Sequence, residues 1–390
     1  MKRWRLILIL LPLLALGAVA AGYAYLRSQD PDMLRDELAL SLATALGREV
    51  TIDGSLKFRL RPLPAVAVTG LRIGNPDWAH QEQLLTVERL DLVPSIPALL
   101  RGRVVIHRLE LEGLALWLEN GPNGTPNWQL PPREEDPSAT PMRLQAIDAR
   151  NVTLRYFNSR TGVTRALELD ELRATGKRRT DPLDIQFTGE IHSLALSGEA
   201  TLDSLATLTG PEPATIDADF QLGDTRLRVD GKLDNADFRD FSGLDLTLDI
   251  AGRRPALVLD WTDLPLPEMR RFDLRGRLVG DEARLALSNL SGRIEGDGFD
   301  LKVAGGAENL ISLAGLDLTI DTTGKALSAI VSRVEGPWLD TDSFRLRGRL
   351  EGQRPRFALE DLDGQLVHSN LDVAFTGRIG DLRSGRDLDL

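Results

Sequence analysis

Apolar and polar residues alternate along most of this chain. The alternation is clearest in Val50–Leu60, Thr86–Val93, Val104–Glu119, Thr225–Leu233 and Gly243–Ile250. Successive side chains of a strand point to opposite faces of a sheet, so a period of two predicts strands with one apolar and one polar face. Asp-Gly, Asn-Gly and Ser-Gly turns separate many of these segments, which indicates short antiparallel strands. We therefore expect a mainly β protein.

The N-terminal segment has a different pattern. Residues 6–26 carry no charged side chain, and the basic residues Lys2, Arg3 and Arg5 precede them. An apolar run of about 20 residues can span a bilayer as a helix. The sequence thus predicts a cytoplasmic leader and transmembrane anchor over residues 1–27, with the rest of the chain on the far side of the membrane. A cleaved signal peptide is the alternative, because Ala18–Ala20 resembles an A-x-A cleavage site.

One amphipathic helix is expected directly after the anchor. Leu34, Leu38, Leu42 and Leu46 fall four positions apart and form one apolar stripe. Asp30 is a suitable N-cap and Gly47 a suitable end, so the predicted helix lies between them.

A proline-rich and charged segment divides the remaining chain. Residues 131–141 (PPREEDPSATP) have the composition of a linker. We expect an α+β region over residues 28–130 before it and a repetitive β region over residues 142–390 after it. Pro94–Gly102 is the one clear helical or irregular interruption of the strands.

The C-terminal half contains an internal repeat. The segment that begins at Phe272 (FDLRGRLVGDEARLALSNLSGRIEGDGFDLKVAGG) resembles the segment that begins at Phe344 (FRLRGRLEGQRPRFALEDLDGQLVHSNLDVAFTGR), which defines a 72-residue repeat. A fixed period built from strands predicts stacked supersecondary units. The last residues, RDLDL, align with the middle of the pattern, so we expect a chain that is shortened at its C-terminus relative to a longer array.

The apolar face of such a sheet needs a cover. We find no strong amphipathic helix after Pro141 that could provide one. The sheet could pack on itself as a β-sandwich, or it could be elongated and curled into a groove that holds an apolar guest. The repeat favours the groove. The residues expected to line it are Leu274, Leu278, Phe299, Leu301, Val303, Phe344, Leu346, Leu350, Leu371, Val373 and Phe375.

Composition excludes several functions. The net charge of −11 is spread along the chain, which argues against a nucleic-acid partner. The absence of cysteine excludes disulfides, thiolate catalysis and cysteine-type zinc sites. No spacing typical of metal ligands connects the histidines, which are His80, His107, His192 and His368. We expect no catalytic residue, no cofactor and no bound metal.

Two further patterns have simple structural interpretations. The stretch LEDLDG, with Asp361 and Asp363, partly resembles a calcium loop, but its repeat partner is LSNLSG, so we interpret it as a turn. Arg345, Arg347 and Arg349 share the polar face of one strand. Because Asp and Glu are abundant nearby, we expect a solvated face there and not a phosphate site.

An ordered set of motifs near the N-terminus points to a family. The motifs are Gly47-Arg48-Glu49-Val50, Asp53-Gly54, Pro62, Pro64, Asn75-Pro76, Trp78-Ala79, Leu99-Leu100-Arg101-Gly102 and Asn127-Trp128. In this order they resemble the AsmA family of bacterial inner-membrane proteins. The resemblance implies a periplasmic β-rich groove, similar to that of the chorein-like bridge lipid-transfer proteins. It also implies a role in carrying phospholipid toward the outer membrane or in supporting outer-membrane biogenesis. It implies no catalytic residues, and typical members continue well past residue 390.

The two tryptophan-containing turns of this region, at Trp78 and Trp128, receive a structural interpretation. We expect both rings to pack the membrane-proximal end of the sheet, with Pro76 and the neighbouring asparagines forming tight turns. The alternative is that Trp78 lies at the bilayer interface and guides lipid into the groove.

The main hypothesis is thus a non-enzymatic carrier or conduit for phospholipid, anchored in the inner membrane with its body in the periplasm. The second hypothesis is a scaffold or assembly factor that binds outer-membrane or other envelope proteins through exposed strand edges. It predicts insensitivity to charges placed on the apolar face. An envelope enzyme is the third hypothesis, and no motif supports it.

Overall fold

The structure is a computed structural model. It describes residues 31–59, 65–95, 105–121, 125–128, 143–159, 162–176, 181–191, 193–203, 213–235, 242–253, 269–281, 284–310, 312–325, 327, 341–382 and 386–390. The expected anchor, Asp30, the linker of residues 131–141 and His192 lie outside these residues, as does the interruption at Pro94–Gly102 except for its first two residues. The described part of the chain contains no helix that is long and apolar enough to cross a membrane.

The chain divides into two compact units, Met1–Leu196 and Ser197–Leu390, which are described separately. The described elements of unit 1 are α2 (Pro31–Leu46), β1 (Val50–Ile52), β2 (Leu56–Arg59), β3 (Ala65–Gly74), β4 (Gln83–Pro94), β5 (Val105–Asn120), β6 (Arg143–Leu144), β7 (Ala146–Asn158), β8 (Val163–Thr175) and β9 (Leu183–Ile191). Strand β10 (Leu194–Leu202) contains the division. Those of unit 2 are β11 (Ala214–Leu222), β12 (Thr225–Asn235), β13 (Ser242–Gly252), β14 (Met269–Gly280), β15 (Leu285–Gly296), β16 (Phe299–Ala307), β17 (Leu316–Gly324), β18 (Ser343–Gln353), β19 (Arg356–His368), β20 (Leu371–Asp381) and β21 (Arg386–Asp389).

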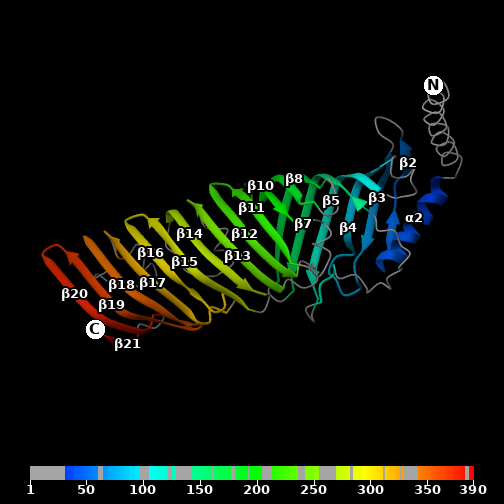
Figure 1. The fold of residues 1–390 in the computed structure, drawn as a ribbon. Helices are drawn as coiled ribbons and strands as arrows, with labels where there is room; N and C mark the ends of the chain where they lie inside the picture. The colour runs from blue at the N-terminus through cyan, green and yellow to red at the C-terminus, as the bar shows by residue number, and fades with distance from the viewer. Residues whose placement is uncertain are drawn as a thin grey trace, which may run out of the picture. The chain divides into compact units, whose positions relative to one another are not determined.

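Helix α2 confirms the predicted amphipathic helix. It ends where Gly47 adopts a left-handed φ of 60°, and the amide of Arg48 donates to the Ala43 carbonyl at 3.3 Å. This is the Schellman arrangement that glycine permits. The stripe of Leu38, Leu42 and Leu46 packs on a core formed by β1 to β4, whose buried members are Val50, Ile52, Leu56, Val68, Leu71 and Val87. In unit 1, therefore, a helix covers the first part of the apolar sheet face (Figure 1).

The described sheet of unit 1 departs from the predicted antiparallel order at β5, which pairs in parallel with the short strand β6 and with β7. Strands β1 and β2 both pair with β3, and β3, β4 and β5 are antiparallel neighbours. Strand β7, however, runs parallel to β5, with Leu109 opposite Ile147 and Leu118 opposite Tyr156. The expected linker of residues 131–141 falls in the chain between these two paired strands. An alternating pattern cannot show strand direction, because parallel and antiparallel strands share the period of two.

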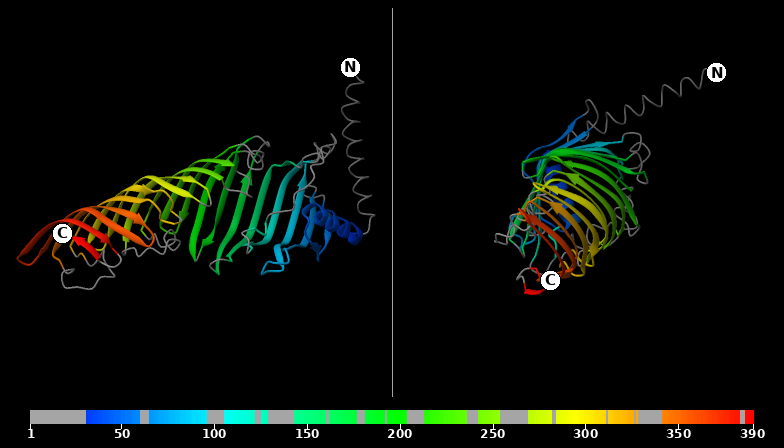
Figure 2. Two further views of the ribbon diagram at one scale, coloured as in Figure 1. Left: turned by 90° about the horizontal axis from the view of Figure 1, so that it is seen from below. Right: turned by 90° about the vertical axis from the view of Figure 1, so that its left-hand side faces the viewer.

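Unit 2 is an open antiparallel sheet in which β11 to β21 pair in chain order (Figure 1). Its strands, coloured green to red, are visibly curved (Figure 2). Within either unit the described strands form a single layer, with no second sheet packed against it. The mainly β, open-sheet prediction is confirmed, and the β-sandwich alternative is not the fold observed.

The sequence repeat corresponds to β14–β17 followed by β18–β21, and its irregularities repeat with it. The β14–β15 register shifts between Arg275 and Arg277, and the β18–β19 register shifts at the equivalent positions, between Arg347 and Arg349. The same inserted residue of β15 also shifts the β15–β16 register, between Leu287 and Leu290, and this shift recurs in β19 between Leu359 and Leu362. Asp361, which we expected to lie in a turn, is instead the left-handed residue of the bulge in β19, with a φ of 49°.

Candidate functional site

All the residues that were expected to line a groove lie on one face of the unit 2 sheet, here called the apolar face. Strand register shows this directly, because residues opposite one another on neighbouring strands share a face. One row across the sheet runs from Ile294 through Leu301, Thr322 and Leu346 to Gly364. A second row joins Phe344 to Leu366 and Val373. The register thus brings together side chains that lie far apart along the chain.

The apolar face is not uniformly accessible. Phe299 and Phe344 are buried, and they form a cluster with Phe272, Ile294 and Leu327. Leu274, Leu301 and Leu346 are half-buried against this cluster. At the other extreme, Leu371 is 61% exposed and Val373 is 39% exposed. The other expected groove residues, Leu278, Val303, Leu350 and Phe375, are half-buried.

Glycines make room for the phenylalanine rings on this face. A Cβ atom built on Gly324 would lie 2.4 Å from Cε1 of Phe344, and one built on Gly364 would lie 2.2 Å from Cζ of Phe375. Each ring therefore rests on the backbone of the neighbouring strand. Only glycine can occupy such a position without displacing the ring.

Among the described residues, Leu327 packs over the buried part of the apolar face from outside the strands, and no sequence pattern indicated it. It is 4% exposed and packs against the phenylalanine cluster. Hydrogen bonds hold the backbone at Lys325 and at Leu327. The Lys325 amide donates to the Gly298 carbonyl at 2.8 Å, and the Thr341 hydroxyl donates to the Lys325 carbonyl at 2.9 Å and accepts from the Leu327 amide at 3.2 Å. Local sequence could not reveal this contact, because it depends on the tertiary position of a short segment outside the strands.

Thr322 is the one polar side chain of the row described above. Its side chain is 3% exposed, and its hydroxyl makes no hydrogen bond. Residues Leu301 and Leu346 lie directly opposite it on the two neighbouring strands. An unpaired buried hydroxyl costs free energy of about 1–3 kcal/mol, so its presence in an apolar row is unusual.

The opposite face of unit 2 carries ion pairs that repeat with the sequence. Arg277 Nη2 lies 2.6 Å from Asp245 Oδ2, and at the equivalent place in the next repeat Arg349 Nη2 lies 2.6 Å from Asp317 Oδ2. Arg275 pairs with Asp249, and Arg347 pairs with Asp321 in the same way. This confirms that the arginine-rich strand face is balanced by aspartates.

These ion pairs shift the pKa values of their members. The hydrogen bond from Arg277 lowers the pKa of the Asp245 carboxyl, and the hydrogen bond from Arg349 lowers that of Asp317. The same bonds raise the pKa of both guanidinium groups. Both carboxylates are therefore held in their charged form.

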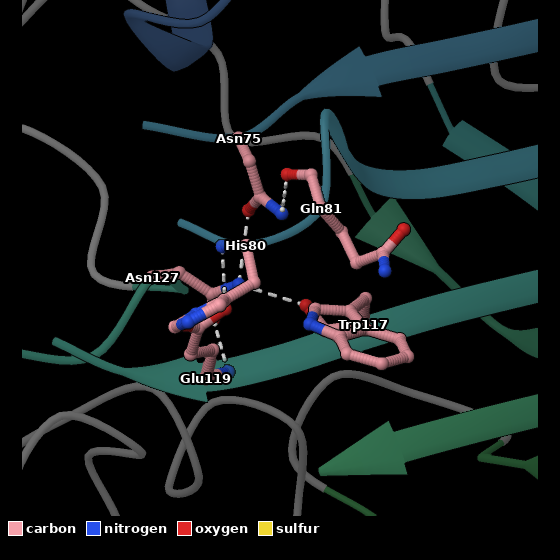
Figure 3. A network of polar contacts seen from close by, with 6 residues as sticks. All are labelled: Asn75, His80, Gln81, Trp117, Glu119 and Asn127. Carbon is pink, nitrogen blue, oxygen red and sulfur yellow. Dashed lines mark hydrogen bonds and ion pairs between the residues drawn. The ribbon is translucent and has the colours of Figure 1, made fainter. Parts of the chain in front are cut away.

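A polar network at the end of β5 joins the two asparagine-containing motifs of unit 1 (Figure 3). Asn127 has no exposed surface. Its side-chain amide donates to Asn75 Oδ1 at 2.9 Å and to the Trp117 carbonyl at 2.8 Å, and its Oδ1 accepts from the Glu119 amide at 2.9 Å. Glu119, 1% exposed, accepts from the His80 amide at 2.9 Å and contacts His80 Nδ1. The network fixes the turn after β3 to the end of β5.

The two tryptophans of this region differ in exposure. Trp78 is 37% exposed, and its ring lies 3.2 Å from the position of a Cβ on Gly121, so it covers that glycine without being a buried plug. Trp128 is half-buried, with its ring 6.4 Å from that of Tyr156 between centroids. The tight turn at Pro76 is present, since the Ala79 amide donates to the Pro76 carbonyl at 3.0 Å. That Trp78 lies at a bilayer interface stays a prediction.

The described residues offer no group of three histidine, aspartate or glutamate side chains that could hold a metal ion. The features that remain are the apolar face, its partial cover and the charged reverse side. They define a class of protein with an open β-sheet that is apolar on one face and charged on the other. Such an apolar face can bind apolar molecules.

Comparison with known proteins identifies the family. A model of the AsmA family matches residues 1–260, about two thirds of the chain. The chain therefore belongs to the AsmA family, and the match extends well beyond the motifs that end at Trp128. A search of curated proteins finds no match.

Proposed function

We propose that this protein binds phospholipid with its apolar face and conducts it, without catalysis, between the inner and outer membranes of a bacterium, in support of outer-membrane biogenesis. The observation that carries the proposal is the division of the unit 2 sheet into one aliphatic and one salt-bridged face. Family membership supports it. The proposal includes an inner-membrane anchor in residues 1–27 and a periplasmic body.

The mechanism we propose is solvation of the acyl chain. Transfer of an acyl chain into water costs about 0.8 kcal/mol per CH₂, or about 12 kcal/mol for 16 carbons. Contact with half-buried residues such as Val303 and Leu350 replaces that water. The lipid head group stays in solvent. The charged reverse face, in which Arg349 and Asp317 are paired, keeps the protein in solution.

A charge on the apolar face tests the proposal. The double variant Val303→Asp, Val373→Asp should reduce the phospholipid that co-purifies with the full chain at least tenfold. A carboxylate held against an acyl chain loses its hydration, and that loss costs more free energy than a tenfold change in affinity requires. Native mass spectrometry of protein purified from bacterial membranes in mild detergent measures the bound lipid. The single variant Val373→Asp is measured as well, because Val373 is already 39% exposed and its substitution should leave the protein folded.

The matched control moves the same charges to the other face. Ala304 and Ala374 adjoin the two valines, lie on the opposite face of the same strands and are exposed. The variant Ala304→Asp, Ala374→Asp should retain its lipid. Equal lipid in both double variants would contradict the proposal. Function insensitive to charge on the apolar face would favour the scaffold hypothesis, in which strand edges bind envelope proteins.

A further inference from the structure

The repeat makes Thr322 stand out. Ile250 is its counterpart one repeat earlier, and the two occupy equivalent places in the sheet: Ile250 lies opposite Leu274, and Thr322 lies opposite Leu346. One copy of the repeat therefore has an isoleucine where the other has a hydroxyl. The apolar pattern of the face does not require this hydroxyl.

The surroundings of Thr322 leave its hydroxyl without a partner from the protein. Its neighbours across the strands are Leu301 and Leu346, which pack against the cluster of Phe299, Phe344 and Leu327. The hydroxyl is buried and makes no hydrogen bond. A hydroxyl donates one hydrogen bond and accepts others, so a ligand that brought a carbonyl oxygen into this place would satisfy it.

We propose that Thr322 belongs to a subsite for the ester group of a diacyl lipid, whose acyl chain takes the place that Leu327 holds against Phe299 and Phe344. This inference rests on the proposed function. Thr322 lies two positions from Gly324, the last residue of β17, and so near one border of the apolar face. The ester of a phospholipid lies between its acyl chain and its head group. Phe299 and Phe344 lie opposite Gly324 and so nearer this border than Thr322, and a chain over the two rings therefore places the ester carbonyl next to Thr322, with the head group above the open face in water.

Leu327 occupies the place proposed for the acyl chain. Its side chain is aliphatic, it fills the space over the phenylalanine rings, and it comes from outside the strands that build the face. In the proposed subsite a lipid displaces it to place an acyl chain on Phe299 and Phe344. The two contacts therefore belong to one subsite, in which Leu327 competes with the acyl chain and Thr322 recognises the ester.

The test compares an ester lipid with an ether lipid. The full chain in mild detergent is titrated with dioleoyl phosphatidylethanolamine and with its dialkyl ether counterpart, which lacks the carbonyl oxygens, and binding is measured by native mass spectrometry. The wild type should prefer the ester lipid about fivefold, the ratio that one neutral hydrogen bond supplies. Thr322→Val should bind both lipids equally, and its thermal midpoint should rise because a buried unpaired hydroxyl has been removed. Thr322→Ser should keep the preference.

Two further variants complete the design. Thr319→Val, at an exposed position on the opposite face of β17, should leave the preference unchanged. Leu327→Ala should strengthen binding of both lipids with the same ester preference. Equal binding of ester and ether lipid by the wild type, an unchanged preference in Thr322→Val, or weaker binding in Leu327→Ala would overturn the subsite while leaving lipid binding intact. Binding of neither lipid by the wild type would instead contradict the proposed function.

Discussion

Asn127 connects three other residues through a side chain that has no exposed surface. Its partners are Asn75, Trp117 and Glu119, which come from the turn after β3 and from the end of β5. The large tryptophan side chains of these two motifs were the more obvious features of the sequence. Asparagine is common in turns, and a hydrogen bond between two turns that are distant in the chain leaves no local pattern. The sequence therefore indicated the motifs but not the contact that joins them.

Substitution of this residue should be strongly destabilising. Asn127→Ala leaves Asn75 Oδ1, the Trp117 carbonyl and the Glu119 amide without their partner, and we expect a loss of about 3 kcal/mol. For a unit of this size that corresponds to a fall in thermal midpoint of roughly 6–12 °C. Circular dichroism of the full chain during heating measures it.

The control for this variant is Gln81→Ala. Gln81 is an exposed neighbour in the same network. It contributes its backbone carbonyl, which accepts from the side-chain amide of Asn75 at 2.9 Å. Alanine keeps that carbonyl, so the midpoint should change little. Comparable losses in the two variants would show that the network does not stabilise the unit.

At the scale of strands, the alternating pattern predicted most elements correctly, and its irregularities coincide with the bulges. Leu287 and Leu290, like Leu359 and Leu362, are spaced by three within a pattern of period two. That extra residue is the bulge, because a strand with one inserted residue must bulge to keep its apolar side chains on one face. Strand direction was beyond the pattern, and so the parallel pair of β5 and β7 was not predicted.

The repeating ion pairs should make the stability of unit 2 depend on acidity. The pKa values of Asp245 and Asp317 are lowered in the folded protein by hydrogen bonds from arginine. Because the pKa of each carboxyl is lower in the folded than in the unfolded protein, ionisation stabilises the fold at pH values above the unfolded pKa of about 4. This stabilisation is lost as the pH falls through the pKa of the folded state. The variant Asp245→Asn, Asp317→Asn should thus be less stable than the wild type at pH 6, and the difference should shrink toward pH 3.

Urea denaturation at pH 6, 4 and 3 measures this difference. Added salt should reduce it at pH 6, because these pairs are exposed to solvent and screened. Asp297→Asn is a useful comparison, since Asp297 lies in a turn and its ion pair with Arg270 is not one of the pairs that repeat with the sequence. A double-variant difference that grows in acid would contradict the assignment.

For the molecule as a whole, sequence predicted the fold and the face more fully than it predicted access to that face. The residues expected to line a groove all lie on one face of one sheet, because strand alternation and the repeat determine which face a side chain is on. The cover over Phe299 and Phe344 was missed, because Leu327 belongs to no periodic segment. Thr322 was missed for the opposite reason, since a threonine in an alternating strand is ordinary until its burial is known.

Removal of one whole repeat should be tolerated. Deletion of residues 272–343 joins Arg271 to Phe344, so that β13 can pair with β18 in the register that β17 uses now, with Gly252 in place of Gly324. Because repeat proteins gain stability from neighbouring units, we expect a folded protein with cooperative unfolding and only a modest loss of thermal midpoint. Far-ultraviolet circular dichroism and a heating curve measure both.

A deletion out of phase is the control. Removal of residues 272–307, half a repeat, takes out β14, β15 and β16 and places β17 after β13, so strand direction and the positions of the bulges no longer match. This variant should lose cooperative unfolding. Similar behaviour of the two deletions would mean that the period of the sequence has no structural meaning.

The recurrence of bulges and ion pairs in each repeat has a consequence for the evolution of the gene. A duplication or loss of one such segment in the gene needs no new packing, since every bulge, glycine and charge meets its usual neighbour at the seam. Four strands at a spacing of about 4.8 Å change the width of the sheet by about 19 Å. Lineages can therefore change the width of this sheet in steps of fixed size, and unequal recombination is a route to such changes.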